Sequence, residues 1–244
     1  MRLLLVIPAF NEQESLGGLL TEIKALPPIA GSTIEAVVVD DGSSDRTQEV
    51  ARANGARVLR LCRNLGIGGA VQAGLQLAHR EGCDAAVQMD GDGQHPPAEL
   101  ARLLDAPTAD LIVGTRYTEG AKGFRSTALR RLGSSWLRAI LRMVGVKISD
   151  PTSGFRLYGP RALRLFADSY PYDFPEPESL AMARAAGLTV SEVSVTMRER
   201  QGGRSSISGY TSIYYMFKVT LAVVLAYLRT NRRTRAAEVP DAGG

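Results

Sequence analysis

The sequence predicts an α/β fold built on a mostly parallel sheet, and three observations indicate it. Short apolar runs alternate with amphipathic segments through the first half of the chain, as expected for parallel strands joined by helices that cover both faces. Polar motifs follow the ends of these runs, where parallel sheets bind ligands. The 244 residues, 45% of them hydrophobic, can also bury one full core. The predicted strands are Leu3–Ile7, Ile34–Asp40, Arg57–Leu61, Ala85–Met89 and Leu111–Gly114.

Charge and cysteine content restrict the possible functions. The 29 Lys and Arg against 25 Asp and Glu give a formal net charge of +4, which is too small an excess to indicate a nucleic-acid partner. Cys62 and Cys83 follow no metal or redox spacing and suit a reducing compartment. The chain opens on the apolar run Leu3–Ile7 without the features of a secretory signal, so we expect a cytoplasmic location.

The most informative stretch is an apolar run that stops at two carboxylates, Asp90 and Asp92. Alternate side chains of an extended strand share a face, so both carboxylates are expected to point to one place as the strand ends. Mg²⁺ or Mn²⁺ prefers oxygen ligands and keeps positions for water and nucleotide phosphates, so these two residues and the Gln94 amide would be sufficient protein ligands. The same Asp-Gly-Asp-Gly sequence is also typical of an ordinary exposed turn.

Polar motifs follow the other predicted strands as well. After the first strand, Asn11 is expected to cap a helix, with Glu14 completing a capping box. A Ser or Asp of Asp40–Asp45 is expected to cap the next helix. The glycine-rich Arg63–Ala70 is expected to open a helix with free N–H groups. Each motif alone is most simply a capped loop, but together they indicate one binding rim.

The glycine-rich loop does not fit the common nucleotide-binding classes. It follows the third strand and lacks the Gly-x-Gly-x-x-Gly spacing of dinucleotide-binding proteins, and the chain has no Gly-Lys-Ser/Thr phosphate loop. A nucleotidyltransferase is disfavoured because no glycine- and lysine-rich loop follows the first strand. What remains is a nucleotide site built from carboxylates.

These motifs resemble the ordered signature of glycosyltransferase family 2, which has the GT-A fold. The resemblance is closest to its polyprenyl-phosphate (dolichyl-phosphate) mannosyl- and glucosyltransferase branch, and it extends from residue 3 to about residue 209. The matching motifs are Ile7–Glu12, Asp40–Asp45, Arg63–Gly66, Met89–Pro97, Gly114–Tyr117 and Asp150–Arg156.

The resemblance implies a role for individual donor-site residues. The nucleotide base and ribose would be lined by Pro8, Phe10, Glu12, Val39 and Asp41. The resemblance places Asp90 and Gly91 at the ribose or phosphate, makes Asp92 and Gln94 ligands of Mg²⁺ or Mn²⁺, and makes Arg116 a donor contact.

One segment of the second half is a candidate for binding the acceptor. Leu129–Val144 reads as an amphipathic, basic helix, which is either a packed surface helix or a face for anionic headgroups. By the resemblance, Arg131 and Ser135 would bind the acceptor phosphate, with Arg130 and Ser134 as the alternative register.

A loop near residue 200 is expected to close over the donor. Related enzymes carry Arg-x-x-Gly-x-Ser-Lys in a loop over the donor pyrophosphate. This chain matches at Arg200, Gly203 and Ser205, but has Ser206 for the Lys, and Arg204 is close enough to replace the charge.

The last part of the chain is expected to contact other surfaces. A helix at Glu176–Ala186 and a strand at Thr189–Met197 are followed by the apolar Ile213–Leu228 and a group of arginines. This apolar segment is too short and interrupted to span a bilayer. It is expected to lie in the membrane interface, or to dock on the protein or on a partner subunit. The predicted division is a catalytic domain at 1–209, this helix with its basic end at 210–235, and a disordered tail at 236–244.

The resulting hypothesis is an inverting, metal-dependent transfer of mannose or glucose from a nucleoside diphosphate sugar to a polyprenyl phosphate. The transfer would take place at the inner face of the cytoplasmic membrane. Asp92, Arg116 and Arg200 would be catalytic because the metal and the guanidinium groups stabilise the departing nucleoside diphosphate. A phosphate acceptor is already anionic and needs no base.

Two alternatives stay open. A hydroxyl acceptor would require a carboxylate base, for which Glu176 and Glu178 are the candidates, although charging and capping a helix start is their plainer role. The other is a non-catalytic nucleotide-binding module. Mannose and glucose differ in one hydroxyl orientation, which these motifs do not distinguish, and the oligomeric state is equally open.

Overall fold

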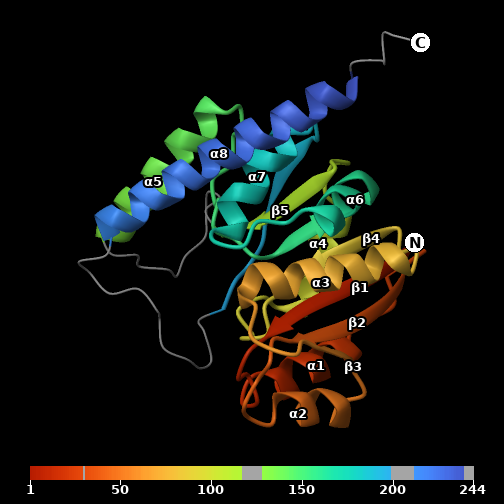
Figure 1. Ribbon diagram of the computed structural model, residues 1–244. Helices are drawn as coiled ribbons and strands as arrows, with labels where there is room; N and C mark the ends of the chain where they lie inside the picture. The colour runs from red at the N-terminus through yellow and green to blue at the C-terminus, as the bar shows by residue number, and fades with distance from the viewer. Residues whose placement is uncertain (30, 117–127, 199–211, 239–244) are drawn as a thin grey trace.

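The computed structural model describes residues 1–29, 31–116, 128–198 and 212–238 (Figure 1). Its sheet has seven strands in the order β3-β2-β1-β4-β6-β5-β7. The strands are β1 (Arg2–Ala9), β2 (Thr33–Asp40), β3 (Arg57–Arg60), β4 (Ala85–Gln88), β5 (Leu111–Thr115), β6 (Arg156–Tyr158) and β7 (Val190–Ser194). The helices are α1 (Leu16–Lys24), α2 (Thr47–Ala53), α3 (Gly66–Arg80), α4 (Leu100–Leu104), α5 (Ala128–Met143), α6 (Pro160–Asp168), α7 (Pro175–Ala185) and α8 (Ser212–Glu238), and a 3₁₀ turn, η1 (Pro97–Glu99), precedes α4.

The sheet forms the middle of three layers, because its strands are apolar on both faces. In β1, Leu4 and Val6 point into a core shared with residues of α3, α5, α6, α7 and α8. The alternate residues Leu3, Leu5 and Ile7 point into a second core that includes residues of α1, α2 and α4. This two-sided burial confirms the α/β fold predicted from the continuous apolar runs.

Strand direction places the polar motifs on one edge. β1 is parallel to β2 and β4, β2 to β3, and β5 to β7. The short β6 is antiparallel to both of its neighbours, β4 and β5. The carboxyl ends of β1, β2, β4 and β5 therefore meet at the same edge of the sheet, as the sequence predicted.

Two elements were not predicted from the sequence. β6 has only three residues, which is too short to show a periodic pattern, and the helix that follows it, α6, was also not predicted. β6 lies between β4 and β5, and its first residue, Arg156, is in register with Gln88 of β4 and Val113 of β5. The segment that enters β6 is therefore placed between the strand ends that carry Asp90 and Arg116.

The two long helices of the second half pack side by side (Figure 1). α8 contacts α7 and α5, and Val219 and Val223 of α8 are buried in that contact. The inner face of the predicted interfacial helix thus docks on the protein, and the helix ends at Glu238, three residues after the predicted Arg235. Within the described residues, no helix has the length and apolar character needed to cross a membrane.

Candidate active site

The two carboxylates of the central motif lie in a turn directly after β4. β4 ends at Gln88, so the expectation that Asp90 and Asp92 share a face of an extended strand is wrong. Within this turn, Oδ1 of Asp92 accepts the backbone N–H of Gln94, two residues later, at 3.0 Å. Asp92 is buried, whereas the Asp90 side chain is about a third exposed. Gly93, with φ +76°, provides the left-handed conformation that the turn requires.

The first strand end supports this turn. The Ser15 hydroxyl lies 3.0 Å from the carbonyl oxygen of Gly91 and 2.6 Å from Oε2 of Glu12. A Cβ on Gly91 would lie 3.1 Å from the carbonyl oxygen of Pro8, so a larger residue would crowd this backbone approach. Pro8, Glu12 and Gly91, three of the residues expected at the donor, are thereby brought together.

His95 was not assigned a role from the sequence, but it is buried in the centre of this region. Its Nδ1 accepts the backbone N–H of Asp90 at 3.1 Å, and its ring stacks on Phe155 with centroids 5.1 Å apart. Burial lowers the pKa of His95 to about 4, so the ring is neutral at pH 7 and Nδ1 is free of a proton. The 3.9 Å approach of Nδ1 to Asp90 Oδ2 is therefore not an ion pair. The signal that could have found this residue is its position three residues after Asp92.

The segment before β6 touches both sides of the site. Asp150, which is fully buried, accepts a hydrogen bond from Nε of Arg116 at 2.8 Å. A Cβ on Gly154 would lie 2.9 Å from both carboxylate oxygens of Asp90, so only glycine lets the carboxylate approach the backbone this closely. The charges of Asp92, Arg116 and Asp150 all act on His95, which indicates that these groups share one small volume.

The loops after β1 and β2 are joined by hydrogen bonds. The predicted capping box at Asn11 and Glu14 is wrong, because α1 begins only at Leu16. Asn11 instead has φ 56° and accepts the N–H of Ser44 through Oδ1, while its own N–H bonds to Ser43. The loop between β1 and α1 is therefore shaped by the neighbouring strand end. A local helix signal could not reveal that arrangement.

At the starts of both α2 and α3, an aspartate side chain accepts backbone N–H groups. The sequence predicted such a cap only for the helix after β2. Asp45 Oδ1 accepts the N–H of Thr47, the first residue of α2. Asp41, which was expected at the nucleotide, accepts the N–H groups of Leu65 and Gly66 at 2.7 and 2.9 Å. Burial raises the pKa of Asp41, and these two bonds oppose that rise. Two of the N–H groups expected to be free at the glycine-rich helix start are thus bound by Asp41.

Two other expected donor residues differ sharply in exposure. Phe10 is 46% exposed and offers an aromatic face at the rim. Val39 is fully buried in the core, so any contact of this residue with a nucleotide would involve its backbone.

The two glutamates at the start of α7 lie in different environments. Glu178 Oε1 accepts the N–H of Phe174, which is the helix-capping role that was the plainer expectation. Glu176 is affected by the charges of Arg156 and Asp90, and burial raises its pKa above the ordinary value. Of the two glutamates, Glu176 is the one whose pKa responds to the charge of Asp90.

Some expected site residues are not placed by the described structure. Arg200 and Arg204 lie outside the described residues. Arg131 belongs to α5, but its side chain is not among those described. Ser135 of α5 is exposed and accepts a hydrogen bond from Arg138 at 2.9 Å. The expected acceptor pair, Arg131 with Ser135, remains a prediction.

The aspartate turn can be judged as a metal site from its donor set. The described residues contain no ready cluster of three His, Cys, Asp or Glu side chains around one point. Asp90 and Asp92 still supply hard oxygen ligands, and Mg²⁺ is commonly bound through one or two carboxylates together with substrate phosphates and water. These residues therefore fit a cation that arrives with a nucleotide better than a permanent structural metal.

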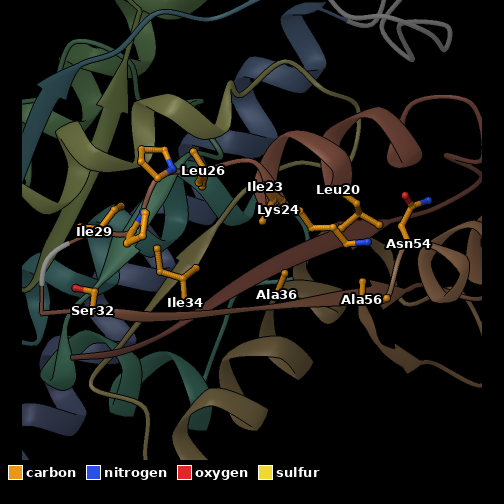
Figure 2. A pocket seen from close by; sticks show the side chains of 13 residues that line it. Leu20, Ile23, Lys24, Leu26, Ile29, Ser32, Ile34, Ala36, Asn54 and Ala56 are labelled. Carbon is orange, nitrogen blue, oxygen red and sulfur yellow. The ribbon is translucent and has the colours of Figure 1, made fainter.

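A separate pocket lies far from these groups, between the C-terminal part of α1, the beginning of β2 and residues 54–56 (Figure 2). Its lining is mostly apolar and includes Leu20, Ile23, Ile29 and Ile34, with Lys24 and Asn54 as polar members. Its lining residues from β2, Ile34 and Ala36, belong to the first half of that strand, away from the carboxyl end of the sheet where the aspartate turn lies. The pocket has no carboxylate or histidine in its lining, so it is not the candidate active site.

Comparison with known proteins gives consistent similarities. The model of the family described as glycosyl transferase family 2 matches residues 4–166. Undecaprenyl-phosphate mannosyltransferase of Micrococcus luteus is 35% identical over 86% of this chain and 88% of its own length. Polyprenol monophosphomannose synthase of Mycolicibacterium smegmatis is 36% identical over 89% of this chain and 85% of its own length.

Solved structures show the same fold. Glucosyl-3-phosphoglycerate synthase from Mycobacterium tuberculosis, in complex with Mn²⁺, uridine diphosphate and glucosyl-3-phosphoglycerate, matches with a TM-score of 0.66 and 21% identity. The match covers 99% of this chain and 82% of that chain. The same enzyme with Mg²⁺ and uridine diphosphate matches with a TM-score of 0.65 and 20% identity.

Proposed function

Because the chain belongs to glycosyltransferase family 2 and is a glycosyltransferase of GT-A fold, we propose that it transfers a hexose from a nucleoside diphosphate sugar to a polyprenyl phosphate. The reaction proposed is metal-dependent and inverting, at the inner face of the cytoplasmic membrane. The names of both bacterial relatives support the acceptor class, and they favour mannose over glucose as the sugar. The observation that carries the proposal is the Asp90–Asp92 turn beside the Arg116–Asp150 pair, at the carboxyl edge of the sheet.

The chemistry requires a site that accepts negative charge. A cation held by Asp90, Asp92 and Gln94 would supply Lewis-acid stabilisation of the donor pyrophosphate. Arg116 adds a guanidinium group whose direction is fixed by the buried Asp150. Fixed charges in a partly buried site stabilise a developing anion more than mobile charges do, because they need no reorganisation when the bond breaks. Arg200 and Arg204 are proposed to complete this charge from the loop outside the described residues.

The acceptor phosphate is proposed to attack without a general base, since a phosphate monoester is already largely ionised at neutral pH. Arg131 and Ser135 are proposed to hold it from α5. The helix-capping contact of Glu178 supports a mechanism without a general base, because its Oε1 already accepts the N–H of Phe174.

A hydroxyl acceptor is the second candidate, and Glu176 is the observation that favours it. Burial raises the pKa of this carboxyl, which lies close enough to Asp90 to be affected by its charge. A carboxylate with a raised pKa near the site is a suitable general base.

A donor and acceptor screen tests the proposal. GDP-mannose and UDP-glucose, each radiolabelled in the sugar, are offered with a short-chain polyprenyl phosphate, with the corresponding polyprenol, or with water alone. We expect label in the organic phase only with the phosphate acceptor. Transfer to the polyprenol would select the hydroxyl alternative instead. If neither transfer nor hydrolysis occurs with any donor, the chain is a non-catalytic nucleotide-binding module.

The outer face of α8 supports the membrane part of the proposal. Phe217, Leu221, Leu225 and Leu228 are 69%, 50%, 38% and 47% exposed, and they recur at helical spacing to form the α8 outer stripe. Arg229, Arg232 and Arg233 follow it on the same helix and are exposed. An apolar stripe with a basic end suits a helix that lies on an anionic membrane surface.

The α8 outer stripe is expected to carry vesicle binding. In the double variant L221Q/L225Q, two apolar contacts with the bilayer are lost, and we expect sedimentation with phosphatidylglycerol-containing vesicles to weaken by about tenfold or more. The matched control L221M/L225M keeps both positions apolar and should bind as the unmodified chain does. Equal binding by all three proteins would contradict a role of this stripe in membrane contact.

A further inference from the structure

Arg156, the first residue of β6, is a fully buried cation. Its guanidinium is satisfied by neutral oxygens: Nε donates to the carbonyl of Ser153 at 2.7 Å, and Nη1 donates to the hydroxyl of Ser179 at 2.6 Å. Nη2 donates to the carbonyls of Pro151 and Glu176, at 3.4 and 2.9 Å. Burying an arginine in this way is costly compared with an apolar residue of similar volume, so its presence needs a reason other than packing.

The acceptors of Arg156 belong to two different parts of the fold. Pro151 and Ser153 lie in the turn that starts at Asp150, whereas Ser179 and Glu176 lie in the first turns of α7. The guanidinium therefore fastens the turn to the helix. A lysine could not replace it, because a single ammonium group cannot reach four acceptors in this forked arrangement.

The turn that Arg156 holds also fixes the Asp150 carboxylate. Thr152 donates its hydroxyl to Asp150 Oδ1 at 3.0 Å, and the N–H of Ser153 bonds to the carbonyl of the same aspartate at 3.4 Å. The other carboxylate oxygen, Oδ2, accepts Nε of Arg116 at 2.8 Å. A continuous series of contacts thus leads from α7 through Arg156 and the turn to Asp150 and Arg116.

We propose that Arg156 is a positioning residue, which sets the direction of the Arg116 guanidinium by holding the Asp150–Ser153 turn against α7. This inference rests on the proposed function, in which Arg116 contacts the donor. Arg156 is buried behind the site and acts on Arg116 through Asp150. Its replacement is expected to displace a catalytic group without removing any group that touches the donor.

The variant R156K tests the inference. It keeps the positive charge but not the fork, and we expect kcat/KM for the sugar donor to fall by about 10²-fold, the size of effect that follows from misplacing a catalytic group by about 1 Å. Circular dichroism should show the same fold. The matched control is R161K on α6, where the replaced arginine is exposed and pairs with Asp110, and its activity should be unchanged.

The coupling to Arg116 separates a positioning role from a general loss of stability. In the double variant R116A/D150N the contact that Arg156 serves is absent, so adding R156K should lower kcat/KM by less than about threefold, because mutations in one series of contacts are not additive. An equal loss in both backgrounds, or no loss in the otherwise unmodified chain, overturns the inference. If R156K does not fold, S179A removes one acceptor of the guanidinium and should show the same dependence on background.

A second measurement distinguishes failure of the positioning role from failure of the proposed function. Equilibrium binding of GDP and of UDP in the presence of Mn²⁺ is measured for every variant. Turnover by the unmodified chain with unchanged kinetics in R156K contradicts the positioning role alone. Nucleotide binding without turnover contradicts the proposed function, while weaker binding by R156K in that case still supports the positioning role. Absence of both binding and turnover in the unmodified chain overturns both.

Discussion

The D92N variant is expected to lose sugar transfer by at least about 10²–10³-fold while remaining folded. Asn keeps a side-chain oxygen that can accept the Gln94 N–H, so the turn after β4 is preserved. It lacks the negative charge that the proposed role of Asp92 as a ligand of a divalent cation requires. The loss should therefore reflect catalysis rather than structure. Initial rates with saturating donor, together with a thermal unfolding curve, measure the two effects separately.

The metal dependence of the same reaction supplies the control. EDTA should abolish transfer by the unmodified chain, and added Mn²⁺ or Mg²⁺ should restore it, whereas the small residual rate of D92N should respond little to either. Full activity of the unmodified chain in EDTA would refute the metal site at Asp90, Asp92 and Gln94. Full activity of D92N would place the cation on other residues.

Replacing Arg116 by alanine is expected to reduce both activity and stability. Arg116 bonds to the fully buried Asp150, and removing one partner of a buried ion pair typically costs about 3–5 kcal/mol because a buried charge is left uncompensated. The lost guanidinium should also lower kcat by about 10²-fold or more, since its proposed role is to stabilise the departing nucleoside diphosphate. Chemical denaturation and initial rates measure the two losses.

The double variant R116A/D150N separates these two effects. Asparagine at position 150 removes the uncompensated charge but keeps an oxygen that can accept the Thr152 hydroxyl. Stability should therefore recover in large part, and activity should not. If activity recovers together with stability, Arg116 has a structural role only, and the donor contact must be assigned elsewhere.

The pH dependence of activity should not follow His95. Burial lowers the pKa of this ring to about 4, so it stays neutral throughout the range in which the phosphate acceptor ionises. Because the unfolded chain takes up this proton at the ordinary pKa of 6.5 and the folded chain only near 4, the free energy of unfolding should fall as the pH drops from about 6.5 to about 4. His95 therefore contributes to the turn at neutral pH through its Nδ1 acceptor.

Short-range patterns in the sequence were sufficient for the main features of the fold. The apolar runs identified six of the seven strands, and their alternation with helices identified the parallel arrangement and the edge at which polar motifs gather. The positions of Asp90, Asp92 and Arg116 at that edge follow from the same reasoning, because the carboxyl ends of parallel strands lie together whatever the details of the loops.

The remaining features depend on contacts between residues far apart in the chain. β6 is antiparallel and only three residues long, and Arg156 lies between β4 and β5 because of long-range pairing that no local period encodes. Asn11 adopts a left-handed conformation against the loop after β2 instead of capping a helix.

The sequence alone determined which chemical groups the chain can bring to the carboxyl edge of its sheet, because side-chain type and the succession of apolar runs and polar motifs along the chain are local properties. Only the tertiary structure decided how those groups are held. Burial and hydrogen bonding by distant residues fix the direction of Arg116, the neutral state of His95 and the different environments of Glu176 and Glu178.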